Sequence, residues 1–216
     1  MALAAGVDVS ATRGLDVVVL DARRRPVTAR ARVEPGELAA LLDAAGPQLA
    51  VVAIDSPPGP GEAGRTRPCE IALRRRHIRV FSTPAVDEGY DRPFFDWVRA
   101  GEEAFAAAEA AGFPRLRHRG APAGHALEVF PHATDVVLRG ATPPPRTLRS
   151  AAKKRAWRAA TLAAAGVDTG ALRSVDLVDA ALAALTGLLA LAGEAELVGE
   201  PPFLLAVPAR ALTARA

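Results

Sequence analysis

The chain has 216 residues, of which 50% are hydrophobic and 24% are charged. This hydrophobic content excludes a disordered chain, and the length is typical of one domain over residues 1–216. The formal net charge of +3 permits nucleic-acid binding without requiring it. The single cysteine, Cys69, excludes an internal disulfide and a thiolate zinc site.

The amino-terminal residues lack the basic and apolar regions of a signal peptide. The most apolar stretch, 177–192, is shorter than the roughly 20 residues that span a membrane, and it contains Asp179. We therefore expect a cytoplasmic protein without a membrane segment.

The first quarter of the chain predicts a meander of three strands, then a helix and a buried strand. The third strand alternates apolar and polar residues, and Pro35 is tolerated in the first turn of the helix. The last run, LAVVAI, is typical of a strand buried on both faces. The predicted elements are strands 5–10, 15–21 and 27–33, helix 35–45 and strand 49–55. A helix between two strands favours a parallel crossover, so we expect an α/β fold with a mixed sheet flanked by helices.

Residues 56–125 are rich in Pro, Gly and Arg, and we expect an insertion that forms a lid or a substrate wall. Its predicted elements are helix 69–76, strand 77–81 and helix 96–111. Beyond it, Ser150 is a candidate N-cap. The remaining predicted elements are strand 126–130, helices 131–138, 151–165 and 174–191, and a hairpin from 196–198 and 203–207.

Acidic residues interrupt the apolar runs, where a charge is costly without a function. Asp8, Asp55 and Glu128 lie on or end predicted strands, and Asp179 lies in an apolar helix. Ligand sites of open α/β sheets lie at the carboxyl ends of strands, and Mg²⁺ or Mn²⁺ takes carboxylate oxygens. We therefore expect these four, with Asp176 on the same helix face as Asp179, to bind metal.

Each candidate also has a structural interpretation. A strand-end Asp also makes Asx turns, and Asp176 also suits a helix N-terminus. His132 either positions water or substrate, or caps a helix. The basic residues either contact phosphate or form surface ion pairs. The candidate substrate-binding residues are Arg67, Glu70, Arg74, His132, Lys154 and Arg158.

Several phrases together resemble the family called "domain of unknown function 429", which is described as predicted ribonuclease H-like nucleases. They are GVDVS, VVAIDSPPG, RPCEIALRRRHIRVFSTP, LEVFPHA, KKRAWRAATLAAAGVD and VDLVDAALAALTGLLA. The resemblance extends from about residue 5 to about residue 200. It implies a ribonuclease H-like sheet, with Asp8, Asp55, Glu128 and Asp179 as the catalytic metal-binding residues. It also implies that Arg67, Glu70, Arg74 and Lys154 line the substrate side.

The expected function is that of a magnesium- or manganese-dependent nuclease acting on nucleic acid. Asp8 would bridge two metals, Asp55 and Glu128 would hold one, and Asp179 the other. A homodimer is a further expectation. Two alternatives stay open. One is an ATP-binding or phosphotransferase protein of the sugar-kinase-like fold, and the other is a non-catalytic binding module.

Overall fold

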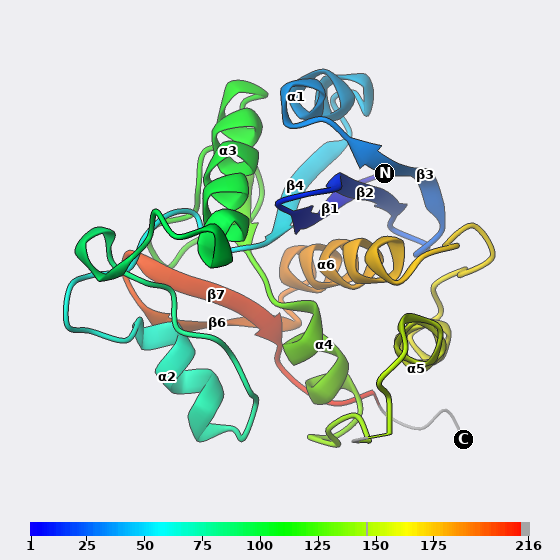
Figure 1. The fold of residues 1–216 in the computed structure, drawn as a ribbon. Helices are drawn as coiled ribbons and strands as arrows, with labels where there is room; N and C mark the ends of the chain where they lie inside the picture. The colour runs from blue at the N-terminus through cyan, green and yellow to red at the C-terminus, as the bar shows by residue number, and fades with distance from the viewer. Residues whose placement is uncertain (146, 213–216) are drawn as a thin grey trace.

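The computed structural model describes residues 1–145 and 147–212. Its centre is a five-stranded mixed sheet in the order β3-β2-β1-β4-β5 (Figure 1). Neighbours β1 and β2, and β2 and β3, are antiparallel, whereas β4 is parallel to both β1 and β5. The expected mixed sheet and α/β class are therefore confirmed. The strands are β1 (Leu3–Ser10), β2 (Gly14–Asp21), β3 (Pro26–Val33), β4 (Leu49–Asp55) and β5 (His125–Glu128).

Helices cover both faces of this sheet (Figure 1). On one face, α1 (Pro35–Ala44) and α3 (Asp96–Ala110) share a core with the apolar side chains of β1 and β4. On the other face, α6 (Val175–Leu191) packs against β1, β2 and β4. A further layer, formed by α5 (Ala151–Ala164), packs on α6, which explains why α6 is apolar nearly all round.

The remaining elements pack beside this layered unit. A separate two-stranded sheet is formed by β6 (Ala195–Glu200) and β7 (Phe203–Pro208), which confirms the predicted hairpin. It packs with α2 (Pro68–Arg75) and α4 (Pro131–Leu138) around a core of its own (Figure 1). None of the described helices is long and apolar enough to cross a membrane.

Two features of the expected insertion 56–125 differ from the sequence analysis. Helix α3 belongs to the main core, since Ala104, Phe105 and Ala108 are buried against the sheet. The predicted strand 77–81 is wrong. His77 has a left-handed φ of 59° in the turn after α2, and the residues that follow have no regular structure. Short 3₁₀ turns at Val86–Glu88 and Pro93–Phe95 complete this segment.

A glycine in β1 sets the distance between α6 and the sheet. A Cβ built on Gly6 would lie 2.0 Å from the carbonyl oxygen of Ala180 and 2.3 Å from the backbone nitrogen of Ala184. Only glycine permits so close an approach of strand and helix backbones. This contact brings the first turns of α6 over the carboxyl end of β1, where the acidic residues lie.

Candidate active site

A row of aspartates crosses the carboxyl end of the sheet. Asp8 in β1 is the register partner of Asp55 in the parallel strand β4 and of Asp16 in the antiparallel strand β2. Register partners point to the same face of a sheet, and this face is the one that Gly6 presents to α6. The structure therefore brings Asp8 and Asp55 together, as expected from the sequence, and adds Asp16.

Helix α6 contributes two more carboxylates. Ser174 caps the helix by accepting a hydrogen bond of 2.9 Å from the backbone nitrogen of Leu177. Asp176 lies in the first turn and pairs with Arg13, with 2.9 Å between Oδ2 and Nη1. Asp179 is buried, and its Oδ2 accepts a hydrogen bond from Arg158 of α5. Its Oδ1 is buried without a hydrogen-bond partner among the described residues.

The electrostatics of this carboxylate cluster (Asp8, Asp16, Asp55, Asp176 and Asp179) show that its members repel one another. Burial and the carboxylates of Asp55 and Asp179 raise the pKa of Asp8. Burial, then Asp179, raises the pKa of Asp55 to about 8, although Arg158 opposes this shift. Burial raises the pKa of Asp179 and of Asp16 to about 6. A cation bound at the cluster would relieve this repulsion and favour the charged carboxylates.

Glu128 takes a different place from the one expected. Its register partner is Ile54, so its side chain follows the face opposite to that of Asp55. Its Oε2 accepts a hydrogen bond from Nη2 of Arg67, and both side chains are buried. Glu128 is therefore the counter-ion of a buried arginine. The structure does not place it with Asp8 and Asp179 as a shared metal ligand.

Arg67 and Glu70, which were expected to line the substrate side, are buried at the amino-terminal end of α2. Arg67 is 2% exposed and donates to Oγ1 of Thr83 at 3.2 Å. Glu70 accepts hydrogen bonds of 3.0 and 2.6 Å from the backbone nitrogen and Oγ1 of Thr83. Together with Glu128 they form a buried ionic network that ties α2 to β5 and to the segment after α2.

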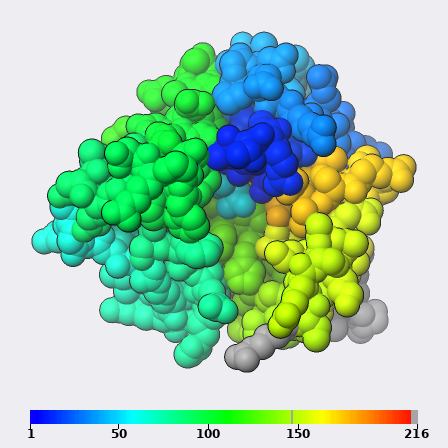
Figure 2. Space-filling view, viewed as in Figure 1, coloured from blue at the N-terminus to red at the C-terminus, as the bar shows by residue number. Residues whose placement is uncertain are grey.

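The other predicted substrate-binding residues separate into two groups. Arg158 lies beside the cluster, since it donates a hydrogen bond to Asp179. His132 is half-buried, and burial and then the charge of Arg158 lower its pKa. Arg74 and Lys154 are exposed on α2 and α5, and Arg74 donates to Oγ of Ser82 at 2.6 Å. The molecule is hollowed between the green segment that contains α3 and the yellow α5 (Figure 2). Lys154 therefore lies on one of the two elements that border this hollow.

A cavity of about 390 Å³ opens next to the cluster. We call it the aromatic cavity, because Phe81, Phe94, Trp97 and Phe130 line it. Asp55 and Ser56 at the end of β4 line it too, as do the buried Arg67, Glu70 and Glu128. The remaining lining residues are Val9, Pro57, Val80, Thr83, Val129 and Leu205. This cavity therefore joins an apolar wall to ionic groups beside the carboxylates.

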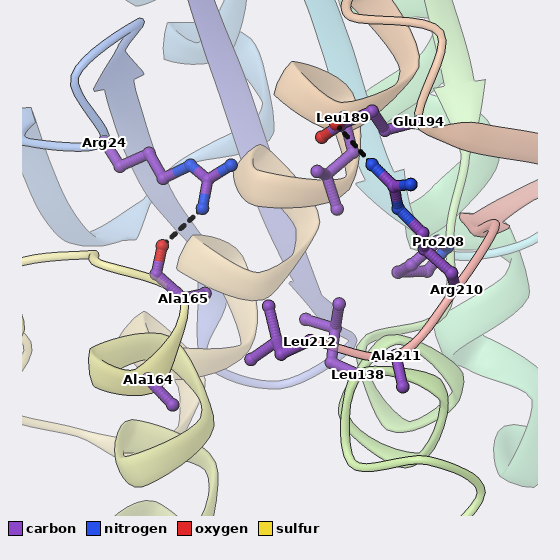
Figure 3. Close-up of a pocket in the computed structure, with 10 residues that line it drawn as sticks. All are labelled: Arg24, Leu138, Ala164, Ala165, Leu189, Glu194, Pro208, Arg210, Ala211 and Leu212. Carbon is purple, nitrogen blue, oxygen red and sulfur yellow. Dashed lines mark hydrogen bonds and ion pairs between the residues drawn. The ribbon is translucent and has the colours of Figure 1, made fainter. Parts of the chain in front are cut away.

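A different cavity, of about 190 Å³, lies between α5, α6 and the carboxyl-terminal segment (Figure 3). Its polar side chains are occupied within the chain. Arg24 donates to the carbonyl oxygen of Ala165, and Arg210 pairs with Glu194 at 3.1 Å. These contacts are structural, and the residues that line this cavity include no candidate catalytic residue.

Sequence reasoning missed Asp135, which positions Arg158. Asp135 is fully buried in α4 and accepts from Nε1 of Trp157 at 2.8 Å and from Nε of Arg139 at 3.2 Å. Thr161 also donates to it, so α5 is anchored on α4 at the residue that precedes Arg158. An acidic residue in an apolar helix was the available signal, the same one that identified Asp179.

The chemistry of the carboxylate cluster suits a divalent metal ion. Asp8, Asp55 and Asp179 offer only carboxylate oxygens, which hard divalent cations prefer, and Oδ1 of Asp179 is unpartnered within the described residues. Over residues 1–145 and 147–212, however, no group of three or more His, Cys, Asp and Glu side chains is close enough to share one ion. Arg158 provides the positive charge at Asp179.

The fold and the site define a mixed α/β protein with a carboxylate cluster at the carboxyl edge of its sheet. A family model described as "Protein of unknown function (DUF429)" matches residues 6–203. The chain therefore belongs to this family, as the resemblance of its sequence motifs indicated. No curated protein and no solved structure matches the chain significantly.

Proposed function

We propose that this protein is a ribonuclease H-like nuclease that uses Mg²⁺ or Mn²⁺ to hydrolyse phosphodiester bonds of nucleic acid. The observation that carries the proposal is the register pair Asp8 and Asp55, with Asp179 of α6 packed over the same edge. Carboxylates on adjacent strand ends and on a facing helix are a suitable donor set for hard cations.

The strand arrangement supports the ribonuclease H-like part of the proposal. An antiparallel meander of β1, β2 and β3 is followed by β4 and β5, which are parallel to β1. This order resembles that of the ribonuclease H-like sheet, in which the first strand carries an aspartate of the site. By this proposal Asp8 in β1 corresponds to that aspartate.

In the proposed reaction the register pair Asp8 and Asp55 would hold the cation, and Asp179 of α6 would add negative charge beside it. A bound divalent ion would supply Lewis acidity and a more acidic water. Asp16 and Asp176 add negative charge next to these ligands and increase the attraction for a cation. Arg158 lies at the same edge, and its guanidinium is suited to bind a phosphate group of the substrate. The exposed side chains of Lys153 and Lys154 in α5 would contact the phosphate backbone of the nucleic acid, independently of its base sequence.

The test is cleavage of a labelled panel containing single- and double-stranded DNA, RNA, an RNA–DNA hybrid and a four-way junction. The wild type and Asp8→Asn are compared with Mg²⁺, with Mn²⁺ and with EDTA. Asp43→Asn is the matched control, because Asp43 is exposed on α1. We expect metal-dependent cleavage by the wild type and the control, and none by Asp8→Asn.

Absence of cleavage by a folded wild type, or equal cleavage by Asp8→Asn, would overturn the proposal. Hydrolysis or tight binding of ATP would then favour the phosphotransferase alternative. A folded chain without either activity would favour the binding module. The homodimer and a cytoplasmic location stay predictions.

A further inference from the structure

The aromatic cavity has a wall suited to a flat ring. Phe81 and Phe94 are 71% and 63% exposed, and their rings meet edge to face with centroids 6.2 Å apart. Large aromatic side chains are seldom left so exposed at the mouth of a cavity without a ligand to cover them. Trp97 also lines the cavity, and its carbonyl oxygen accepts a hydrogen bond of 3.3 Å from Oγ of Ser56.

The lining of the cavity also includes two residues that carry buried polar atoms without partners among the described residues. Nε of Arg67 and Oε2 of Glu70 have no hydrogen bond within the described part of the chain, although each residue is only 2% exposed. One is a donor and the other an acceptor. Nη1 of Arg67 and Oε1 of Glu70 are 3.7 Å apart, so the two side chains lie next to each other. Leaving such atoms unpaired is costly, and a ligand with an adjacent acceptor and donor would satisfy both.

The cavity also touches the carboxylate cluster. Asp55 belongs to the cluster and lines the cavity, and Ser56 follows it in the chain. The volume of about 390 Å³ is within the range of small-ligand pockets and admits one aromatic heterocycle with room for a sugar. A ligand that fills the cavity would therefore place the group attached to its ring near Asp55, the register partner of Asp8.

From these three observations we propose that the aromatic cavity binds one nucleobase of the substrate. The base stacks on Phe81 and Phe94 and presents its hydrogen-bonding edge to Arg67 and Glu70, while the attached phosphate lies at the carboxylate cluster. The proposal rests on the proposed function for the position of the phosphate, but recognition of the base does not depend on metal or on cleavage. Flat rings with adjacent donors and acceptors distinguish nucleobases from lipids and sugars.

The test uses free nucleosides, which carry no phosphate and need no metal. Adenosine, guanosine, cytidine and uridine are titrated into the metal-free protein by calorimetry and by tryptophan fluorescence. Trp97 lines the cavity, whereas Trp157 is bound to buried Asp135 in another part of the fold. We expect saturable binding with quenching in the wild type, and loss of the quenching in Trp97→Phe with binding still detected by calorimetry.

Phe81→Ala removes an exposed stacking surface without disturbing the core, so binding of each nucleoside should weaken about tenfold. Val86→Ala is the matched control, because Val86 is 67% exposed in the same segment and does not line the cavity. Glu70→Gln keeps an acceptor for Thr83 and replaces the unpaired acceptor with a donor. It should change the order of preference among the four nucleosides.

Absence of saturable binding of every nucleoside, or binding that Phe81→Ala and Val86→Ala weaken equally, would overturn the inference. The two proposals fail separately. Cleavage without nucleoside binding would refute the base pocket alone. Nucleoside binding without cleavage would refute the nuclease and would leave the base pocket in place.

Discussion

Asp8 and Asp55 are direct register partners in parallel strands, and burial raises the pKa of both carboxyl groups, with a further rise from the charge of Asp55 at Asp8 and from that of Asp179 at Asp55. Ionisation of such a pair is unfavourable in the folded chain, because each charge would lie in a poorly solvated place. A protein keeps groups like these where they serve a site. The dependence of stability on pH therefore tests the raised pKa of this pair.

The free energy of unfolding should fall as pH rises from about 4 to about 8. The pKa of Asp55 is about 8 in the folded chain, against an ordinary value of 3.8, so the folded state binds its proton more tightly. This stabilisation is present below pH 4 and lost as pH rises through 8. Asp55→Asn removes the group that titrates. It should therefore match the wild type near pH 4 and be more stable at pH 8, as measured by urea unfolding.

Mg²⁺ at pH 8 should restore stability to the wild type and not to Asp55→Asn, since only the wild type keeps the charge that a cation neutralises. Asp43→Asn serves as the control for a surface charge. The raised pKa of Asp55 would be contradicted if the difference in unfolding free energy between the wild type and Asp55→Asn did not change with pH.

Gly6→Ala should destabilise the protein by about 3 kcal/mol, because the added Cβ overlaps the backbone of α6. The displaced helix would also carry Asp179 away from Asp8, so metal-dependent stabilisation should weaken. Gly36→Ala is the matched control, since a Cβ there meets no atom within 4 Å. In α1 it should be neutral or stabilise by up to about 1 kcal/mol. Equal urea midpoints for the two variants would show that α6 tolerates the shift.

Arg158→Met should lower the stability of the metal-free protein and increase its affinity for Mn²⁺. The substitution removes the partner of buried Asp179, at a cost of about 3 kcal/mol, and also removes the positive charge that competes with a cation. Urea unfolding measures the first effect and calorimetry the second. Arg155→Met is the control on the same helix, because Arg155 donates to the carbonyl oxygen of Leu172. Equal Mn²⁺ affinity in the two variants would exclude competition by Arg158.

Glu128→Gln should lower the stability of the protein and leave its affinity for Mn²⁺ nearly unchanged. Arg67 is 2% exposed and would lose the nearer of its two charged partners, which costs about 3 kcal/mol. Glu103→Gln, on the exposed side of α3, is the control. Thermal unfolding with and without Mn²⁺ reports both quantities. A large loss of Mn²⁺ affinity at unchanged stability would restore Glu128 as the metal ligand expected from the sequence.

Much of the fold followed from the sequence, because local patterns determine local structure. The apolar run before Asp55, the Pro-initiated α1 and the Ser-capped α5 and α6 all lie within a few residues of their predicted positions. Strand 77–81 failed because its apolar residues had no neighbouring strand to pair with in the described chain. Ile78 is buried against α2 instead.

The sequence by itself determined that carboxylates end buried strands, which brought Asp8, Asp55 and Asp179 forward as candidates. Only the tertiary structure decided which of them meet. A shift of one residue in register reverses the face on which a side chain lies, and no local pattern specifies the register between distant strands. Pairing with Ile54 directs Glu128 to Arg67, whereas pairing with Asp8 directs Asp55 to α6. The site is a property of packing between segments far apart in the chain.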